Sequence, residues 1–353
     1  MALNKTKGLL ERLKSGETLV CAEGYLFQFE RRGYLKAGAF VPEVVLEHPE
    51  LIRQQYEEYV HAGSDIVLAF TYYAHRAKLA VIDREKDVEK MNREALRIAR
   101  EVADKTGTLM AGNISNSTVY NPEDSEWKQK ATAMFKEQIE WAVDAGADFM
   151  IAETYGDLAE AMVALECIKT YGKGMPAVIN MAIHRIIVDG KPATLDGVVF
   201  ADAMRQLEAA GADVVGLNCA RGPATMLPLL EELKQVVTVP VAALPVVYRT
   251  SEKEPNFQAL TDPLTGEKLF PINLDCMQCN RADIVKFGKR CKELGVQFVG
   301  LCCGNSAHYT RALAESVGKN PPASRYSPNL EQHFALGKLQ NNSYNVTHVK
   351  TNF

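Results

Sequence analysis

The sequence contains no long hydrophobic run and no marked excess of charge of either sign. No stretch of about 20 consecutive apolar residues occurs, so we expect no membrane-spanning helix. The 40 Lys and Arg residues nearly balance 44 Asp and Glu, and the formal net charge of -4 gives no sign of a nucleic-acid-binding surface. A hydrophobic content of 47%, without any low-complexity tract, is typical of a globular protein with a large core.

The N-terminal segment, residues 1–16, lacks the features of a secretory signal. It is short, polar and amphipathic, with neither an apolar core region nor a small-residue cleavage site. We therefore expect a cytoplasmic protein whose eight cysteines are reduced. In a reducing compartment cysteines serve as metal ligands, nucleophiles or inert packing residues more often than as disulfides.

A pattern of helix, Gly-containing turn and short apolar strand recurs along the chain. Four copies lie at residues 61–70, 144–153, 209–218 and 293–302. Four further apolar runs lie at residues 18–24, 109–115, 177–183 and 240–245. Continuous apolar runs are typical of parallel strands that are covered on both faces. Eight such strands alternating with helices predict an α/β fold, a (β/α)8 barrel of the TIM type.

We expect the barrel to occupy residues 1–320 and a short C-terminal extension to occupy residues 321–353. The extension is polar and weakly patterned, which favours a segment that lies on the barrel or on a partner. Two further segments, 116–130 and 249–275, are rich in Asn, Pro, Asp and Thr and are predicted to be long loops that follow strands.

Three cysteines stand where strands of the predicted barrel end. Cys219 follows the sixth strand, and Cys302 and Cys303 follow the eighth, in the stretch QFVGLCCGNS. Active sites of such barrels lie at the C-terminal ends of the strands, so three thiolates can converge on one ion. Three protein ligands and one open position match a catalytic zinc site, because structural sites use four ligands. A substrate thiol in the open position would lose its proton and stay nucleophilic, which suits attack on an alkyl group.

Other interpretations of the cysteines stay open at this point. The three residues could be small core residues of a reduced barrel, since free Cys is among the most buried residue types. The pair Cys276 and Cys279, in C-M-Q-C, is a competing metal or redox candidate in the long loop after the seventh strand. No second C-x-x-C pair accompanies it.

The chain resembles the homocysteine S-methyltransferase family. GLNC and GLCCG at the ends of the sixth and eighth strands are similar to the family's signature, and FERRGYLKAG, FTYYAH and IAET look like its betaine–homocysteine branch. The resemblance implies that Cys219, Cys302 and Cys303 bind Zn2+ and that homocysteine binds as its thiolate. A methyl-onium donor, first of all glycine betaine, would then supply the methyl group that gives methionine.

The resemblance also implies the substrate-binding residues. These are Glu23, Gly24, Tyr25, Phe40, Tyr73, Glu153, Thr154 and Tyr155, of which Tyr73 and Glu153 are expected to be catalytic. The departures from the family pattern are Ala22-Glu23-Gly24 for Asp-Gly-Gly, Phe40 for Trp, Thr154 for Tyr and Leu244 for Gln. The thiol half of the expected site therefore matches the family, whereas the methyl-donor half differs.

An ammonium and an onium cation need different partners in such a site. Glu153 is expected to face the ammonium of homocysteine, with a smaller contribution from Glu23, unless Glu23 is a solvated loop acid. Aromatic faces recognise onium cations, and Phe40, Tyr73, Tyr25 and Tyr155 are expected to supply them.

Two questions of function stay open. The donor is glycine betaine or an alternative such as dimethylsulfoniopropionate, S-methylmethionine or another betaine. A non-catalytic barrel that binds zinc or thiols is the other class of function. A homo-oligomer also stays open, although the C-terminal segment that assembles the betaine enzymes into tetramers is much shortened.

Overall fold

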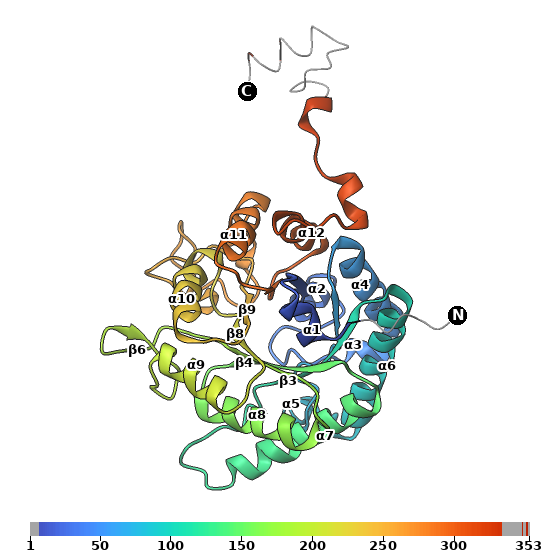
Figure 1. The fold of residues 1–353 in the computed structure, drawn as a ribbon, viewed down its shortest axis with the longest axis vertical. Coiled ribbons are helices and arrows are strands. Elements are labelled where there is room, and N and C mark those ends of the chain that lie inside the picture. The colour runs from blue at the N-terminus through green and yellow to red at the C-terminus, as the bar shows by residue number, and fades with distance from the viewer. Residues whose placement is uncertain (1–6, 334–347, 349–350, 352–353) are drawn as a thin grey trace.

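The computed structural model describes residues 7–333, 348 and 351 and shows a closed barrel of eight parallel strands (Figure 1). The barrel strands are β1 (Leu19–Ala22), β2 (Ile66–Leu68), β3 (Leu109–Ser115), β4 (Phe149–Tyr155), β5 (Ala177–Met181), β8 (Val214–Asn218), β9 (Val241–Leu244) and β10 (Phe298–Leu301). Around the ring the order is β1-β10-β9-β8-β5-β4-β3-β2, so the chain closes by pairing its first and last strands. The predicted (β/α)8 barrel is confirmed.

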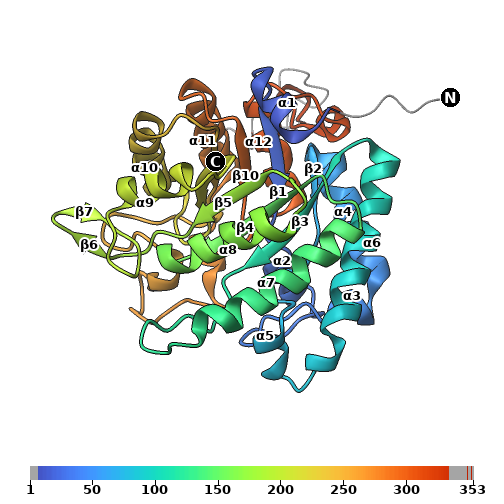
Figure 2. The same cartoon turned by 60° about the horizontal axis from the view of Figure 1, so that its bottom comes forward.

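Helices surround the barrel and cover its outer face (Figures 1 and 2). The covering helices are α4 (Pro49–Ala62), α6 (Val88–Thr106), α7 (Trp127–Asp144), α8 (Leu158–Tyr171), α9 (Phe200–Ala209), α10 (Pro223–Val236), α11 (Arg281–Glu293) and α12 (Ala307–Ser316). In α6 the buried residues Met91, Ala95, Ile98 and Val102 recur every three or four positions, so they form one apolar stripe against the strands. Gly107 ends this helix in the left-handed conformation, at φ 72°.

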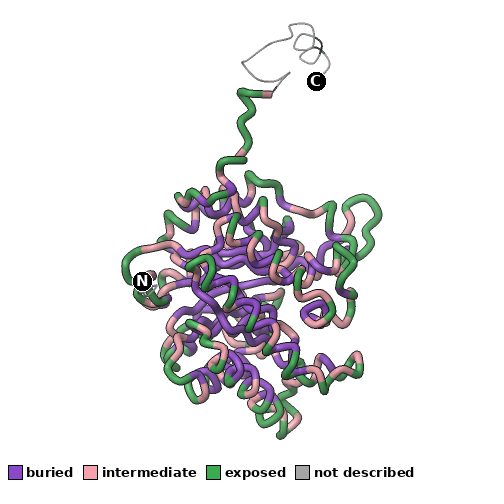
Figure 3. The backbone as a smooth tube through the Cα atoms, turned by 90° about the vertical axis from the view of Figure 1, so that its right-hand side faces the viewer, coloured by how far each residue is buried: buried purple, intermediate pink, exposed green. Residues whose placement is uncertain are grey.

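The strands are buried on both faces, as their continuous apolar sequences predict. All seven residues of β3 and six of the seven residues of β4 are buried. Figure 3 shows this buried interior, with the exposed residues confined to the outer helices and loops. The strand ends are therefore fixed by the core on all sides, which gives the residues that follow them a rigid support.

Shorter elements lie between these units. They are α1 (Leu9–Lys14), α2 (Tyr25–Arg31), α3 (Val44–Glu47), α5 (Arg76–Ala80), the hairpin β6 (Ile187–Val188) and β7 (Lys191–Pro192), and the 3-10 turns η1 (Glu85–Asp87), η2 (Phe257–Ala259), η3 (Leu274–Met277), η4 (Pro322–Tyr326) and η5 (Leu330–Gln332). The hairpin, which the sequence does not predict, projects from one side of the barrel (Figure 2). Helix α2 follows β1 directly and so lies at the C-terminal mouth of the barrel.

The two predicted loops differ in outcome. Residues 249–275 form an irregular loop with short 3-10 turns, as expected. The segment 116–130 is a loop only as far as Glu126, because α7 begins at Trp127 and residues 127–130 are helical. Polar composition hid the first turn of α7, since its exposed residues resemble those of a loop.

The beginning of the C-terminal extension lies against the barrel. Ser324 Oγ donates a hydrogen bond of 2.8 Å to Glu315 Oε1 of α12, and Arg311 Nη1 donates one of 3.3 Å to the Ala323 carbonyl. Residues 334–353 of the predicted extension, apart from residues 348 and 351, fall outside the described residues, so the boundary at residue 320 stays a prediction. No helix among the described residues combines the length and the apolar character that a membrane span needs.

Candidate metal and substrate site

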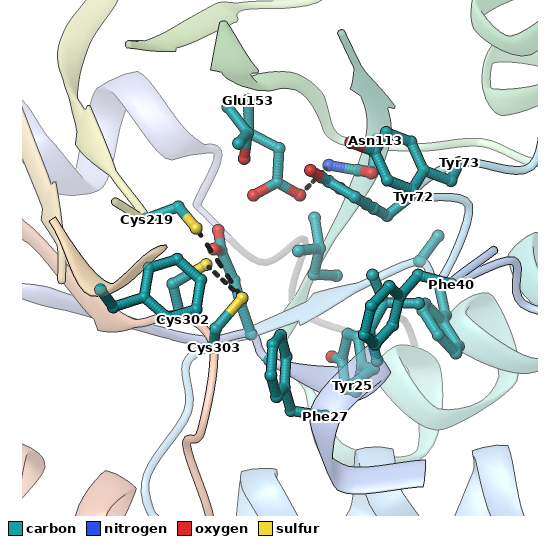
Figure 4. Close-up of a pocket in the computed structure, with 18 of the residues that line it drawn as sticks. Tyr25, Phe27, Phe40, Tyr72, Tyr73, Asn113, Glu153, Cys219, Cys302 and Cys303 are labelled. Carbon is teal, nitrogen blue, oxygen red and sulfur yellow. Dashed lines mark hydrogen bonds between the residues drawn. The ribbon is translucent and has the colours of Figure 1, made fainter. Parts of the chain in front are cut away.

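Three thiols meet at the C-terminal mouth of the barrel. Cys219 follows β8, and Cys302 and Cys303 follow β10 (Figure 4). The Sγ atoms of Cys219 and Cys303 lie 3.7 Å apart, and those of Cys302 and Cys303 lie 3.9 Å apart. Ligand sulfurs about 2.3 Å from a tetrahedral zinc lie about 3.8 Å from one another. Both distances fit edges of a zinc tetrahedron, and the sulfurs of the third pair, Cys219 and Cys302, lie within 4.8 Å of each other. The three thiols can therefore occupy three corners and leave the fourth for another ligand.

Backbone geometry at the two strand ends holds the thiols in place. Cys219 adopts a left-handed conformation, at φ 56°, and its amide donates a hydrogen bond of 3.0 Å to the Leu244 carbonyl. A non-glycine residue with positive φ is costly, so the surrounding structure must enforce this turn. Gly304, at φ 83°, has no room for a side chain, because an added Cβ would lie 2.7 Å from the Tyr248 hydroxyl. This close approach explains the last glycine of GLCCG.

The three thiols shift one another's pKa values. Hydrogen bonds from Cys302 and Cys303 hold the pKa of Cys219 well below its usual value. The interaction with Cys219 in turn raises the pKa values of Cys302 and Cys303. One thiolate shared by two thiols is the arrangement expected when three sulfurs lie close together with no positive charge among them. A divalent cation would allow all three to ionise.

Two buried carboxylates lie beside the thiols. Glu153, near the end of β4, and Glu23, just after β1, are only 3% and 2% exposed. Ligand atoms of Glu23, Glu153 and Cys302 all lie within 4.8 Å of one another. The alternative that Glu23 is a solvated loop acid is therefore wrong, because the residue that follows β1 is buried inside the barrel mouth.

The two carboxylates differ in their partners. Glu153 accepts hydrogen bonds from Asn113 Nδ2, at 2.6 Å, and from Asn218 Nδ2, at 2.7 Å. Neither oxygen of Glu23 accepts a hydrogen bond from any described residue. Burial raises the pKa of Glu153 to about 7 and raises that of Glu23 well above its usual value, with the neighbouring Glu153 as a further cause for Glu23. A buried acid without a partner is costly, so this pair is suited to a cationic ligand.

An aromatic wall completes the cavity. The aromatic lining residues are Tyr25, Phe27, Phe40, Phe70, Tyr72, Tyr73, Phe257 and Phe270. The rings of Phe27 and Phe40 stack with their centroids 5.5 Å apart, and the ring centroids of Tyr72 and Tyr73 lie 4.3 Å apart. Stacked aromatic faces beside the thiol cluster can hold a cation that carries methyl groups.

The structure brings most of the expected site residues to this one cavity. Its lining includes Glu23, Gly24, Tyr25, Phe40, Tyr73, Glu153, Thr154, Cys219, Cys302 and Cys303. Gly24 allows α2 to approach β10 closely, because an added Cβ would lie 2.5 Å from the Cys302 carbonyl oxygen. Its φ of 93° also favours glycine.

Tyr155 does not line the cavity. The expectation that its ring helps to bind the onium cation is therefore corrected. It is completely buried, its hydroxyl donates a hydrogen bond of 3.0 Å to the Ser115 carbonyl, and its ring packs edge-on against Phe135 of α7. The cause is a register shift of β4 between Ala152 and Tyr155, with Thr154 at φ 63°. Thr154 consequently faces the cavity, and Tyr155 faces the surrounding helices.

Several residues that the structure brings to the site are not predicted from the sequence. Asn218 holds both Glu153 and Thr154, with hydrogen bonds of 2.7 Å to Glu153 Oε2 and 2.9 Å to Thr154 Oγ1. An Asn within a buried apolar strand was the signal for it. Phe257, Gln258 and Phe270 come from the loop 249–275, whose composition gives no indication of which residues turn inward.

The C-M-Q-C pair lies apart from this cluster. Cys276 is exposed and its thiol contacts the Asn273 carbonyl at 3.8 Å, whereas Cys279 is buried. Both candidate metal-binding groups among the described residues lie at the barrel mouth, and neither includes Cys276 or Cys279.

The fold and the site define a (β/α)8 barrel with a thiol cluster at its catalytic mouth. A family model described as homocysteine S-methyltransferase matches residues 24–317. The chain is 34% identical over 341 residues to betaine–homocysteine S-methyltransferase 1 of Xenopus tropicalis, with 94% of this chain and 80% of that protein covered. It is 33% identical over 328 residues to S-methylmethionine–homocysteine S-methyltransferase BHMT2 of Mus musculus, with 90% of this chain and 84% of that protein covered.

A structural comparison agrees on the fold. The metallated form of the homocysteine methyltransferase MmuM from Escherichia coli superposes with a TM-score of 0.66 and 19% sequence identity, covering 86% of this chain and 97% of that one. The chain belongs to the homocysteine S-methyltransferase family. It is accordingly an S-methyltransferase, which argues against the alternative of a non-catalytic barrel.

Proposed function

We propose that the protein transfers a methyl group from an onium donor, in the first instance glycine betaine, to the thiolate of homocysteine. Zn2+ would be held by Cys219, Cys302 and Cys303. The observation that carries this proposal is the position of three sulfurs at tetrahedral spacing beside two buried carboxylates, one of them without a partner. The bound metal would supply a Lewis-acidic position at which a substrate thiol is ionised near neutral pH.

The carboxylates would orient the acceptor. Homocysteine carries an α-ammonium as well as a thiol, and a site that recognised only the thiol would accept any small thiol. Glu23, which has no hydrogen-bond partner among the described residues, and Glu153, which Asn113 and Asn218 hold in place, are the anionic groups beside the thiols. An ammonium between them would satisfy the orphaned oxygens and keep the acceptor sulfur aimed at the donor.

The aromatic wall would orient the donor. Phe27, Phe40 and Tyr73 line the cavity, and the faces of aromatic rings attract a cation without forming a bond to it. The onium charge disappears as the methyl group leaves, so the uncharged amine or sulfide head of the product binds these rings less well than the onium head of the donor. The residues of the wall thus favour binding of the donor and release of the demethylated product.

A donor panel tests the proposal. Purified protein is incubated with homocysteine and, separately, glycine betaine, dimethylsulfoniopropionate or S-methylmethionine, and methionine is quantified by mass spectrometry. We expect methionine with at least one of these donors, and about one zinc per chain. Full metal loading with no methionine from any onium donor would contradict the proposal.

A further inference from the structure

An arginine at the end of α2 contacts both ends of the long loop that follows β9. Arg31 is the last residue of α2, and its Nη2 lies 2.7 Å from Asp275 Oδ1 in η3. The same nitrogen donates a hydrogen bond of 3.2 Å to the Tyr248 hydroxyl. When the side-chain amide of Gln278 is turned so that its oxygen faces the guanidinium, Arg31 Nη1 donates to it as well, at 2.8 Å. One side chain therefore joins α2 to residues on either side of the loop 249–275.

The two ends of this loop also pair with each other. Tyr248 and Gln278 form an antiparallel bridge. The Cys279 amide donates a hydrogen bond of 2.9 Å to the Val247 carbonyl. The C-M-Q-C stretch thus closes the base of the loop, and Arg31 holds that base against α2.

The ring of Tyr248 carries this contact into the aromatic wall. It is completely buried and stacks on Phe257, with the ring centroids 5.6 Å apart and an angle of 2° between the planes. Phe257 packs edge-on against Phe27, at 6.0 Å between centroids, and against Phe270, at 5.2 Å. Phe27 lines the cavity from α2, whereas Phe257 and Phe270 line it from the loop. The wall therefore consists of rings from two separate elements, and these rings meet at Phe257.

Ordering a loop so that its rings complete a wall costs conformational entropy. The Arg31 side chain is only 26% exposed and has three partners, so it restricts the loop more than a solvated ion pair would. Arg32, the next residue, has different contacts. Its Nη1 donates a hydrogen bond of 3.4 Å to Gln55 of α4, and its guanidinium lies over the ring of Phe29.

We propose that Arg31 is a positioning residue for the methyl donor, because it fixes the loop 249–275 against α2 and so lets the rings of both elements bind the donor together. This inference rests on the proposed methyl transfer and adds a residue on which donor binding depends. Arg31 does not belong to the described lining of the cavity, so it acts through Tyr248 and Phe257. The thiols follow β8 and β10, so binding of the acceptor does not depend on this contact.

Steady-state kinetics of Arg31→Met and Arg31→Lys provide the first test. Methionine removes the guanidinium, whereas lysine can keep an ion pair with Asp275 but lacks the planar fork that reaches three partners. We expect Arg31→Met to raise the KM of glycine betaine, or of whichever donor in the panel is active, about tenfold or more. The KM of homocysteine and kcat should change less than about twofold, and Arg31→Lys should give an intermediate donor KM. Arg32→Met is the matched control, with both KM values unchanged.

Asp275→Asn tests the same contact from the side of the loop. The Asp275 side chain is 70% exposed, so the variant should fold even if Arg31→Met does not. We expect a rise in the donor KM of about threefold, because an exposed ion pair contributes less than the whole network. The double variant with Arg31→Met should be no worse than Arg31→Met alone, because both changes break one contact. Fully multiplicative effects would overturn this contact as the means by which Arg31 acts.

Hydrogen exchange and calorimetry provide readouts that need no turnover. In Arg31→Met the amides of the loop 249–275 should exchange faster than in the wild type, while those of β8 and β10 stay unchanged. Calorimetry on the homocysteine complex should show glycine betaine bound about tenfold more weakly by Arg31→Met and unchanged by Arg32→Met.

The outcomes separate this inference from the proposed function. An unchanged donor KM, an equal rise in the KM of homocysteine, or unchanged exchange of the loop would overturn the role of Arg31, even in a protein that makes methionine. Faster exchange of the loop and weaker binding of glycine betaine in a protein that makes no methionine would support the role of Arg31 and contradict methyl transfer. Wild-type protein that binds no donor of the panel would overturn both.

Discussion

The two halves of the cavity are built from different kinds of structure. The thiol half comes from residues at the ends of β8 and β10, which the barrel core fixes from both faces. The donor half comes from α2, the turn after β2 and the loop 249–275, which carry Phe27, Tyr73 and Phe257. The whole barrel constrains the strand ends but not the loops. Residues that carry out the reaction are therefore placed at strand ends, whereas residues that select the substrate, and can vary, are placed on loops.

Removing one thiol should give the largest effect. Cys219→Ala leaves two sulfurs at the cluster, and a two-ligand site holds zinc poorly. We expect loss of most of the bound metal and a fall in kcat of at least about a hundredfold. Metal analysis and methionine production check this, and Cys302→Ala and Cys303→Ala should behave alike.

The exposed Cys276 provides the matched control for that experiment. It lies outside the thiol cluster, so Cys276→Ala should retain both metal and activity. If Cys276→Ala lost the metal and Cys219→Ala kept it, the assignment of the metal site would be wrong.

Neutralising one of the two buried carboxylates should give the second-largest effect on activity. Glu153→Gln keeps the shape of the side chain but removes the charge that would face the homocysteine ammonium, and the two asparagines that donate to it would lose a charged acceptor. We expect kcat/KM for homocysteine to fall about 30-fold to 1,000-fold with zinc still bound. Glu23→Gln should give a smaller fall.

An unchanged KM of homocysteine in Glu23→Gln, with every active donor, would remove Glu23 from the site. The homocysteine ammonium would then need another partner. Retained zinc in both carboxylate variants is the control, since it separates loss of acceptor binding from loss of the metal.

Changing the aromatic wall should give a moderate effect confined to the donor. Phe40→Ala removes one ring of the Phe27–Phe40 stack, and we expect the donor KM to rise about tenfold. Phe40→Trp should lower it a few fold, because indole is the strongest cation-binding ring. A matching change in the KM of homocysteine would contradict the division of the cavity into two halves.

Removing the Tyr155 hydroxyl should affect stability alone. Its hydrogen bond to the Ser115 carbonyl lies in the core, outside the cavity. We expect Tyr155→Phe to lower the free energy of unfolding by about 1 kcal/mol in urea titrations, with both KM values unchanged. A selective rise in the donor KM would return Tyr155 to the site.

The difference between the two halves also limits what the sequence can predict. The recurring strands and helices of the sequence predict the barrel. They also predict the positions of Cys219 and Glu153, because the C-terminal ends of all barrel strands lie at the same mouth. Tyr155 was misassigned because a register shift in β4 reverses which neighbour faces inward, and alternation alone does not show such shifts. Phe257 and Gln258 depend on how the loop 249–275 folds over the mouth, for which the sequence has no periodic signal.

X-ray absorption at the zinc edge tests the central claim most directly. Spectra of the zinc-loaded protein are recorded with and without homocysteine, with Cys276→Ala as a control of unchanged coordination. The account predicts three sulfur ligands at about 2.3 Å in the free protein and a fourth sulfur on addition of homocysteine. A sulfur count that does not rise with homocysteine bound would contradict direct activation of the acceptor thiol at this cluster.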